Sequence, residues 1–168
     1  MPKIDIDKLS NIYAVRRLGE ADVEMILSFC RENTQFYEYC GRETCREQIE
    51  NDMHIAPPGI SMDQKYYIGF FDGDKLAAVM DLIGGYPDPE TAFIGFFMMN
   101  KAMQGRGIGS GIVSGVFAYL KKLGFAGCRL GIDKDNPQSN RFWRKNGFEV
   151  IREVEMEDGI ILLAEKRL

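Results

Sequence analysis

The sequence has little of the residue types on which several common kinds of site depend. Its 168 residues contain one histidine, one tryptophan and four cysteines, and no two cysteines are spaced as C-x-x-C. A single histidine with scattered cysteines does not supply the ligands of a zinc site, so we expect no metal site. The simplest state of the cysteines is the free thiol of a reducing compartment, which predicts a cytoplasmic protein.

Two further absences concern membranes and nucleic acids. No apolar run reaches the about 20 residues of a membrane-spanning helix, and residues 1–7 lack the apolar core of a signal peptide. The formal net charge is −4, whereas a nucleic-acid-binding surface is rich in Lys and Arg. We therefore expect neither a membrane nor a nucleic acid as partner. The length fits one domain spanning residues 1–168, and a homodimer is compatible with the sequence.

Hydrophobic periodicity predicts a mixed α/β (α+β) domain. Strands are expected at 12–18, 66–71, 75–83, 91–99, 128–133, 148–156 and 160–166. Helices are expected at 20–31, 42–53, 110–123 and 136–146, and the aromatic stretch 34–40 is expected to be irregular. Short turns favour antiparallel pairing, while the helix between strands 91–99 and 128–133 predicts one parallel crossover. The expected sheet is mostly antiparallel, with about seven strands flanked by about four helices.

The most informative segment follows strand 91–99. Residues 103–110 read Met-Gln-Gly-Arg-Gly-Ile-Gly-Ser and lead directly into helix 110–123. Glycines let backbone N–H groups approach a ligand closely, and the N-terminus of a helix adds a partial positive charge. Together these features predict an anion-binding loop that suits a pyrophosphate.

Two familiar glycine patterns do not fit this loop. The P-loop pattern G-x-x-x-x-G-K-[ST] fails because no lysine follows a suitable glycine. The dinucleotide pattern G-x-G-x-x-G fails because its last position is Ser110 or Ile112, depending on the starting glycine. For the loop taken alone, a glycine-rich turn without a ligand is the alternative.

A third pattern does fit. Gln104-x-x-Gly107-x-Gly109, between a strand and a helix, resembles the [QR]-x-x-G-x-[GA] signature of GNAT-type acyl-CoA N-acyltransferases. Residues 136–148 read Asn-Pro-Gln-Ser-Asn-Arg-Phe-Trp-Arg-Lys-Asn-Gly-Phe and resemble the family's N-x-x-[AS]-x-x-F-Y-x-K-x-G-F. Two linked blocks weigh more than one glycine motif. The resemblance implies a GNAT-like fold, splayed between strands 91–99 and 128–133, and acetyl-CoA as the cofactor.

The resemblance also implies which residues bind coenzyme A. Backbone N–H groups of the loop would hold the pyrophosphate, and the end of strand 91–99 would bind the pantetheine arm as an added strand. The residues so implied are Phe97, Met98, Met99, Gln104, Gly105, Arg106, Gly107, Ile108, Gly109, Ser110, Asn136, Asn140 and Trp143. Alternatives are that Arg106 is a solvated loop residue and that Asn136 caps the helix before Pro137. Arg144 and Lys145 lie either near the adenosine phosphate or in solvent.

The residues that would move protons are less defined. Relatives carry a tyrosine where this chain has Trp143, and an indole N–H is no practical acid at neutral pH. Tyr86 and Tyr119 are alternative acids that the sequence does not rank. The histone-modifying branch of the family carries a catalytic Glu on the strand equivalent to 91–99, at the position of Phe93 in this chain. Relatives that acetylate protein N-termini carry an acid on the next strand, at the position of Gly131. Four acids remain as candidate general bases, acting directly or through water, although each taken singly is better interpreted as a solvated carboxylate: Asp81, Glu90, Asp133 and Glu38.

Two other catalytic groups are less favoured by the sequence. His54 is a lone histidine in a surface loop, which makes it a weak candidate for a general base. The cysteines could form an acyl-enzyme, but without a matching His/Asp set ordinary buried thiols are the better interpretation.

The acceptor site is expected in the N-terminal half of the chain. Phe36, Tyr37 and Tyr39 would wall it and Glu38 would attract an ammonium group, or the same stretch is a packed loop. We interpret the protein first as a cytoplasmic N-acetyltransferase that acts by direct transfer to a primary amine of a small molecule or peptide. The alternatives are a non-catalytic acyl-CoA-binding sensor or structural domain, and a nucleotide-binding module.

Overall fold

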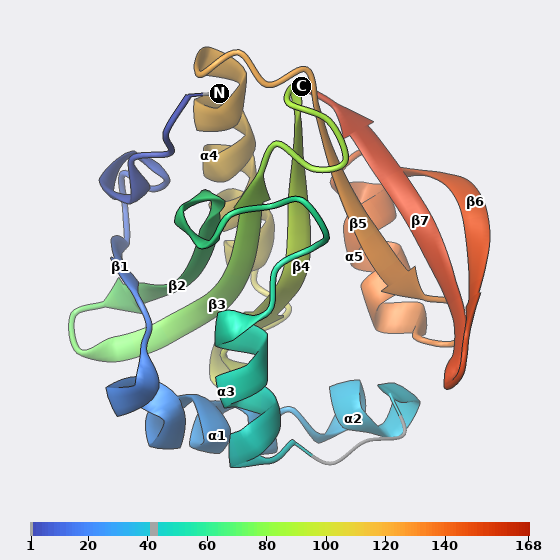
Figure 1. Ribbon diagram of the computed structural model, residues 1–168. Helices are drawn as coiled ribbons and strands as arrows, with labels where there is room; N and C mark the ends of the chain where they lie inside the picture. The colour runs from blue at the N-terminus through green and yellow to red at the C-terminus, as the bar shows by residue number, and fades with distance from the viewer. Residues whose placement is uncertain (1, 41–43) are drawn as a thin grey trace.

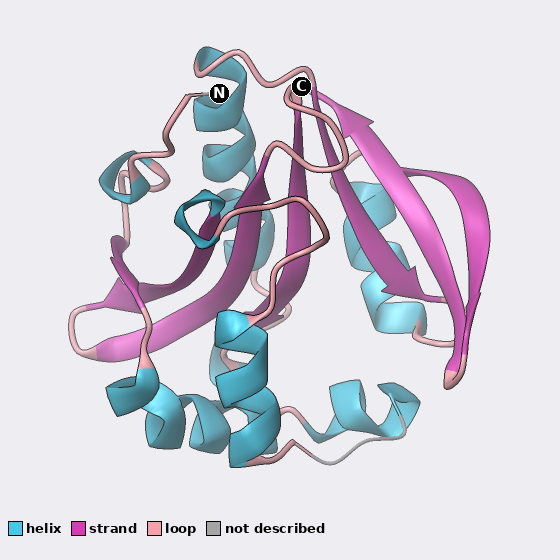
Figure 2. Ribbon diagram, viewed as in Figure 1, coloured by secondary structure: helices cyan, strands magenta, loops and turns pink. Residues whose placement is uncertain are grey.

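A single seven-stranded sheet organises the molecule. The computed structural model describes residues 2–40 and 44–168. Within them the strands lie in the order β1-β2-β3-β4-β5-β7-β6 (Figures 1 and 2). All neighbouring strands are antiparallel except β4 and β5, which are parallel. The predicted sheet and its one parallel crossover are therefore confirmed.

Each predicted strand is present. The strands are β1 (Ala14–Arg17), β2 (Lys65–Asp72), β3 (Lys75–Gly84), β4 (Thr91–Met99), β5 (Gly127–Asp133), β6 (Glu149–Met156) and β7 (Gly159–Arg167). The helices are α1 (Val23–Glu32), α2 (Thr34–Cys40), α3 (Arg46–His54), α4 (Ile108–Lys122) and α5 (Pro137–Lys145). In the ranges that the structure describes, no helix is both long and apolar enough to cross a bilayer.

Helix α2 corrects the expectation that residues 34–40 are irregular. Asn33 ends α1 outside helical geometry, and its carbonyl accepts a hydrogen bond from the backbone N–H of Phe36. The Phe36 ring then packs against Phe96 of β4, with ring centroids 5.8 Å apart. Because a helix this short is stabilised by packing more than by intrinsic propensity, its aromatic sequence gave no helical signal.

Helices cover both faces of the sheet (Figure 1). On one face, α4 and α5 contribute Val116 and Trp143 to a core that includes Met80 of β3. On the other face, α1 and α3 contribute Ile26 and Ile49 to a second core that includes Val79. Successive residues of β3 thus face opposite helical layers, as the alternation of side chains along a strand requires.

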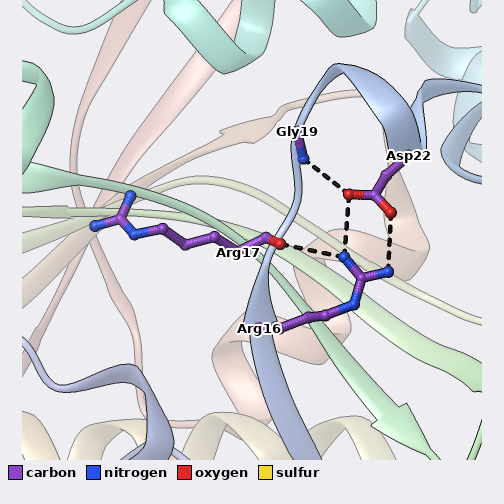
Figure 3. Close-up of polar contacts among 4 residues, drawn as sticks. All are labelled: Arg16, Arg17, Gly19 and Asp22. Atoms are coloured by element: carbon purple, nitrogen blue, oxygen red, sulfur yellow. Dashed lines mark hydrogen bonds and ion pairs between the residues drawn. The ribbon is translucent and has the colours of Figure 1, made fainter.

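A small polar network fixes the start of α1 against β1 (Figure 3). The Arg16 guanidinium donates to both carboxylate oxygens of Asp22, at 3.0 and 2.8 Å. The backbone N–H of Gly19 donates to the same carboxylate at 2.9 Å. The bidentate hydrogen bond from Arg16 is the largest cause of a lowered Asp22 pKa.

This network makes a prediction about stability. Asp22→Asn should lower the free energy of unfolding by about 1 kcal/mol at pH 7, a modest value because half of the Arg16 side chain is exposed. Because the pKa of Asp22 is lowered in the folded state, its contribution is present above the ordinary value of 3.8 and is lost as pH falls through the lowered one. Urea unfolding at pH 7 and pH 3 measures both effects. Asp7→Asn, which changes an exposed acid, is the control, and an equal loss at both pH values would contradict the assignment.

Candidate functional site

The sheet divides between β4 and β5. Their parallel pairing joins Thr91–Ile94 to Gly127–Leu130, and among the described residues it goes no further. Beyond that point β4 pairs with β3 as far as Met99, and β5 pairs with β7 as far as Asp133. The two strands therefore diverge, as Figure 1 shows. Over Phe97 to Met99, the edge of β4 that faces β5 has no strand partner among the described residues.

A cavity of about 270 Å³ lies where the two strands diverge. Its walls come from β4, the loop before α4, helices α4 and α5, and the junction of α1 with α2. The lining residues are Asn33, Gln35, Phe36, Phe97, Met98, Met99, Lys101, Met103, Gln104, Gly105, Gly107, Gly109, Ser110, Asn136, Gln138, Ser139, Phe142, Trp143 and Lys145. Most of the residues that the sequence assigned to the cofactor thus meet around one cavity.

The glycine loop has the geometry of an anion cradle. Gly105 and Gly107 have φ angles of +72° and +76°, which favour glycine. A Cβ atom on either would meet no heavy atom within 4 Å, so the space above the loop is open. No described residue accepts a backbone hydrogen bond from the N–H groups of residues 105–110. Helix α4 begins at Ile108 with no acidic residue in its first turn, so the positive end of its dipole is not neutralised there.

Gln104 and Gly109 have structural functions in this loop. The Gln104 backbone N–H is bonded to the Lys101 carbonyl at 3.4 Å, so it is not one of the open donors. Its side-chain amide donates to Asn33 Oδ1 at 2.5 Å and accepts from Gln138 at 3.3 Å, which joins three walls of the cavity. A Cβ atom on Gly109 would lie 3.1 Å from Met99, so this glycine permits close packing of the loop on β4.

The charges at the cavity favour an anion. Lys101 and Lys145 line it, and none of its described lining residues is acidic. Lys101 was missed by the sequence interpretation because it lies outside both motifs, although its place between Met99 and Gln104 could have indicated it. Arg106 and Arg144 are exposed and do not line the cavity, which leaves the solvated interpretation of both in place.

The two asparagines of α5 differ in position. Asn136 lines the cavity and is 4% exposed, and its Oδ1 caps the helix by accepting from the Ser139 N–H at 3.0 Å. Its Nδ2 has no hydrogen bond recorded among the described residues, so a cofactor contact by that atom is compatible with capping. Asn140 does not line the cavity, and its amide donates to the carbonyls of Asp133, Lys134 and Asn136.

Trp143 is the centre of an aromatic cluster between the two halves of the sheet. The indole is 6% exposed. Its centroid lies 4.8 Å from Phe142, 5.2 Å from Phe148 and 5.8 Å from Phe97 of β4. Phe142 in turn stacks on Phe97 at 5.7 Å. The packing interpretation of Trp143 therefore has direct geometric support.

The four candidate bases lie in very different surroundings. Glu90 and Glu38 are exposed, the first in the turn before β4 and the second on α2. Asp133, at the end of β5, accepts a hydrogen bond from the Asp135 N–H at 3.0 Å. Asp81 alone of the four is buried, and it pairs with Lys65 at 2.6 Å. Burial raises the pKa of Asp81, and Lys65 opposes that shift.

The other polar candidates lie away from the cavity. Tyr86 packs against Phe93 at 5.3 Å, and the Tyr119 hydroxyl accepts from the Asp5 N–H at 3.3 Å; neither lines the cavity. His54 is exposed and lies 3.5 Å from Glu20. No cysteine is among the described lining residues, and burial raises the pKa of the Cys128 thiol, which makes it a poor nucleophile.

The expected acceptor wall is only partly described. Phe36 lines the cavity from α2, together with Asn33 and Gln35, which the sequence interpretation missed. The side chains of Tyr37 and Tyr39 lie outside the described part of the chain. In the described residues, this wall of the cavity is formed by the α1–α2 junction, and Phe36 is held there by its contact with Phe96.

Solved structures of several acetyltransferases have folds similar to that of this chain. An acetyltransferase from Thermus thermophilus matches with a TM-score of 0.74 and 18% identity, covering 93% of this chain and 97% of the other. PaiA N-acetyltransferase from Thermoplasma acidophilum, solved with coenzyme A, matches with a TM-score of 0.66 and 21% identity, covering 93% of this chain and 99% of the other. The Salmonella typhimurium acetyltransferase that modifies the N-terminal serine of ribosomal protein L7/L12 matches with a TM-score of 0.73 and 17% identity. The match covers 95% of this chain and 97% of the other.

The sequence itself identifies the family. No curated protein matches the chain. The sequence profile of the family described as "Acetyltransferase (GNAT) family" matches residues 26–148, well over half of the 168 residues. This span contains the cradle and ends at the aromatic cluster of α5. The chain therefore belongs to the acetyltransferase (GNAT) family.

Proposed function

We propose that this protein is a cytoplasmic N-acetyltransferase. It transfers an acetyl group from acetyl-CoA to a primary amine of a small molecule or peptide, by direct transfer while both substrates are bound. The observation that carries the proposal is the cavity where β4 and β5 diverge, because it combines an anion cradle with an unpaired strand edge.

The residues around the cavity suit the parts of the donor. The open N–H groups after Gln104 and the positive end of α4 suit the pyrophosphate, with Lys101 and Lys145 as additional cations. The unpaired edge of β4 suits the amide groups of the pantetheine arm, which would bind as a short added strand. The donor supplies the activated thioester, and the protein supplies its position.

The transfer step needs stabilisation of charge at two places. A backbone N–H of β4 near Met98 or Met99 would donate to the oxyanion that forms when the amine attacks the thioester. The departing thiolate needs no strong acid, because an ordinary thiol has a pKa of about 8.5. This agrees with a described cavity lining that contains no tyrosine.

A second candidate function is favoured by the lack of a tyrosine at position 143 and in the described cavity lining. A domain that binds acyl-CoA without turnover would keep the cradle and the strand edge and would need no proton donor. The two functions differ in whether coenzyme A is released, and the following experiment separates them.

Release of the coenzyme A thiol from acetyl-CoA tests the proposal directly. The amines to test are spermidine, kanamycin, free amino acids and a peptide with a free N-terminal serine. Some neighbours carry N-acetyltransferase names, and one modifies a protein N-terminus, which supports including the peptide. Amine-dependent release confirms the proposal. Tight binding of acetyl-CoA with no release on any of these amines favours the binding domain.

We predict that Gly107→Glu abolishes binding of coenzyme A. The new side chain enters the open space of the cradle, brings a charge of the same sign as the pyrophosphate, and strains a backbone at φ +76°. Isothermal titration calorimetry with coenzyme A measures the loss. Gly59→Glu is the matched control, because Gly59 is exposed, has a φ of +81° and has equally open space. Unchanged affinity of the Gly107 variant would refute the cradle.

We also predict that Trp143→Tyr keeps or raises the transfer rate while lowering stability by about 1–3 kcal/mol. The smaller ring packs less well among Phe97, Phe142 and Phe148, and its hydroxyl adds a proton donor beside the cavity. Thiol release at saturating acetyl-CoA and thermal unfolding measure the two effects. Trp143→Phe, which lacks the hydroxyl, is the control. A large loss of rate with binding intact would show that the indole itself takes part.

A further inference from the structure

The Asp81 carboxylate occupies a place over β4 that a side chain of β4 would normally fill. Asp81 of β3 is paired with Phe96 of β4, and the next residue, Leu82, is paired with Ile94. Gly95 is therefore the extra residue of a bulge. A Cβ atom on Gly95 would lie 2.7 Å from Asp81 Oδ2. Only glycine at this position leaves room for the carboxylate.

The two oxygens of this carboxylate have different surroundings. Oδ2 accepts a hydrogen bond from Lys65 Nζ at 2.6 Å, and Lys65 is itself 3% exposed. Oδ1 is enclosed but has no hydrogen-bond partner among the described residues. A buried carboxylate oxygen without a partner costs free energy, so it calls for a functional explanation. One oxygen is thus anchored and the other can accept a proton.

Asp81 also lies next to the part of β4 that borders the cavity. Its pairing partner Phe96 directly precedes Phe97, the first β4 residue of the cavity lining. The Phe96 ring contacts Phe36, which lines the cavity from the acceptor side. The carboxylate is therefore on the sheet face that carries the expected acceptor wall, beside the bulge that precedes the unpaired strand edge.

We propose that Asp81 is the general base of the transfer and that Lys65 is the positioning residue that holds it. This inference rests on the proposed function. As the amine nitrogen bonds to the acyl carbon, the carbon–sulfur bond breaks and the nitrogen passes a proton through one water to Asp81 Oδ1, because Asp81 lies beside the cavity and does not line it. The sulfur leaves as thiolate and takes a proton from water, and Asp81 releases its proton to solvent when the amide departs.

The charged neighbours of Asp81 fix the direction of its pH dependence. Burial is the largest cause of its raised pKa, Lys65 of β2 lowers the pKa, and Asp52 of α3 raises it further. Tyr67 lies opposite Asp81 on β2, and Phe96 lies opposite it on β4, next to Gly95; neither β4 residue is charged. Because a base works only when deprotonated, the acid limb of kcat/KM reports the Asp81 pKa. Loss of the Lys65 charge should move that limb to higher pH.

The test uses the full chain, acetyl-CoA and the amine that gives the fastest thiol release among spermidine, kanamycin, the amino acids and the N-terminal serine peptide. Asp81→Asn should lower kcat by about 10²–10⁴-fold, with the affinity for coenzyme A within about twofold of wild type. Lys65→Met should raise the acid limb of kcat/KM by about one pH unit or more, and Lys65→Arg should restore it.

Two further variants keep the test decisive. Gly95→Ala retains both charged residues but displaces the Asp81 carboxylate, so it should lower kcat even if Asp81→Asn does not fold. Glu165→Gln breaks the Arg129–Glu165 ion pair between β5 and β7, which is 2.5 Å long and away from the cavity, and should leave kcat unchanged.

The outcomes separate this inference from the proposed function. A wild-type chain that releases thiol, with Asp81→Asn or Gly95→Ala within about threefold of its kcat, would overturn Asp81 as the base and leave the transferase intact. An unshifted acid limb in Lys65→Met would overturn the role of Lys65. No release by wild type on any amine tested would overturn the proposed function, and this assignment with it.

Discussion

The parallel pairing of β4 with β5 is short, and the whole candidate site depends on where it stops. Four residue pairs join the strands, after which each strand keeps its partner on the other side only. A strand edge without a partner exposes main-chain groups that a ligand can pair with. The same divergence makes room for the cavity and places the N-terminus of α4 at its end. The open glycine loop and the unpaired strand edge therefore border the same cavity because of one feature of the sheet.

Aromatic packing of α5 against β4 accompanies the divergence of the two strands. Trp143 and Phe142 of α5 fill the space between them and contact Phe97 of β4. Large aromatic groups bury much apolar surface, which offsets the loss of strand pairing. Gly109 lets the start of α4 approach Met99 and Phe142 closely. The opening is thus part of the packed core, not a defect in the sheet.

The sequence predicted the parts of this structure that depend on local pattern. Apolar stretches and the turns between them located each described strand, and the two motif blocks located the loop before α4 and helix α5. The sequence did not predict α2, because its stability comes from contacts such as Phe36 with Phe96, which lies far along the chain. Nor did it assign Asn33 to the cavity, since only the fold brings it there.

The sequence also could not rank the four candidate general bases. In the sequence, Asp81, Glu90, Asp133 and Glu38 are equivalent carboxylates. Burial and the ion pair with Lys65 distinguish Asp81, and both arise from the register of β3 between β2 and β4. A pairing register is a long-range property, and no local pattern around Asp81 encodes it.

The position of Trp143 has a practical consequence for spectroscopy. It is the single tryptophan of the chain, and it is buried in the wall of the cavity. All indole emission of the protein therefore originates from one point between the two halves of the sheet. The intensity and wavelength of that emission report the polarity and motion of the cavity wall without any attached label. Trp143 is therefore an intrinsic fluorescent probe in the lining of the cavity.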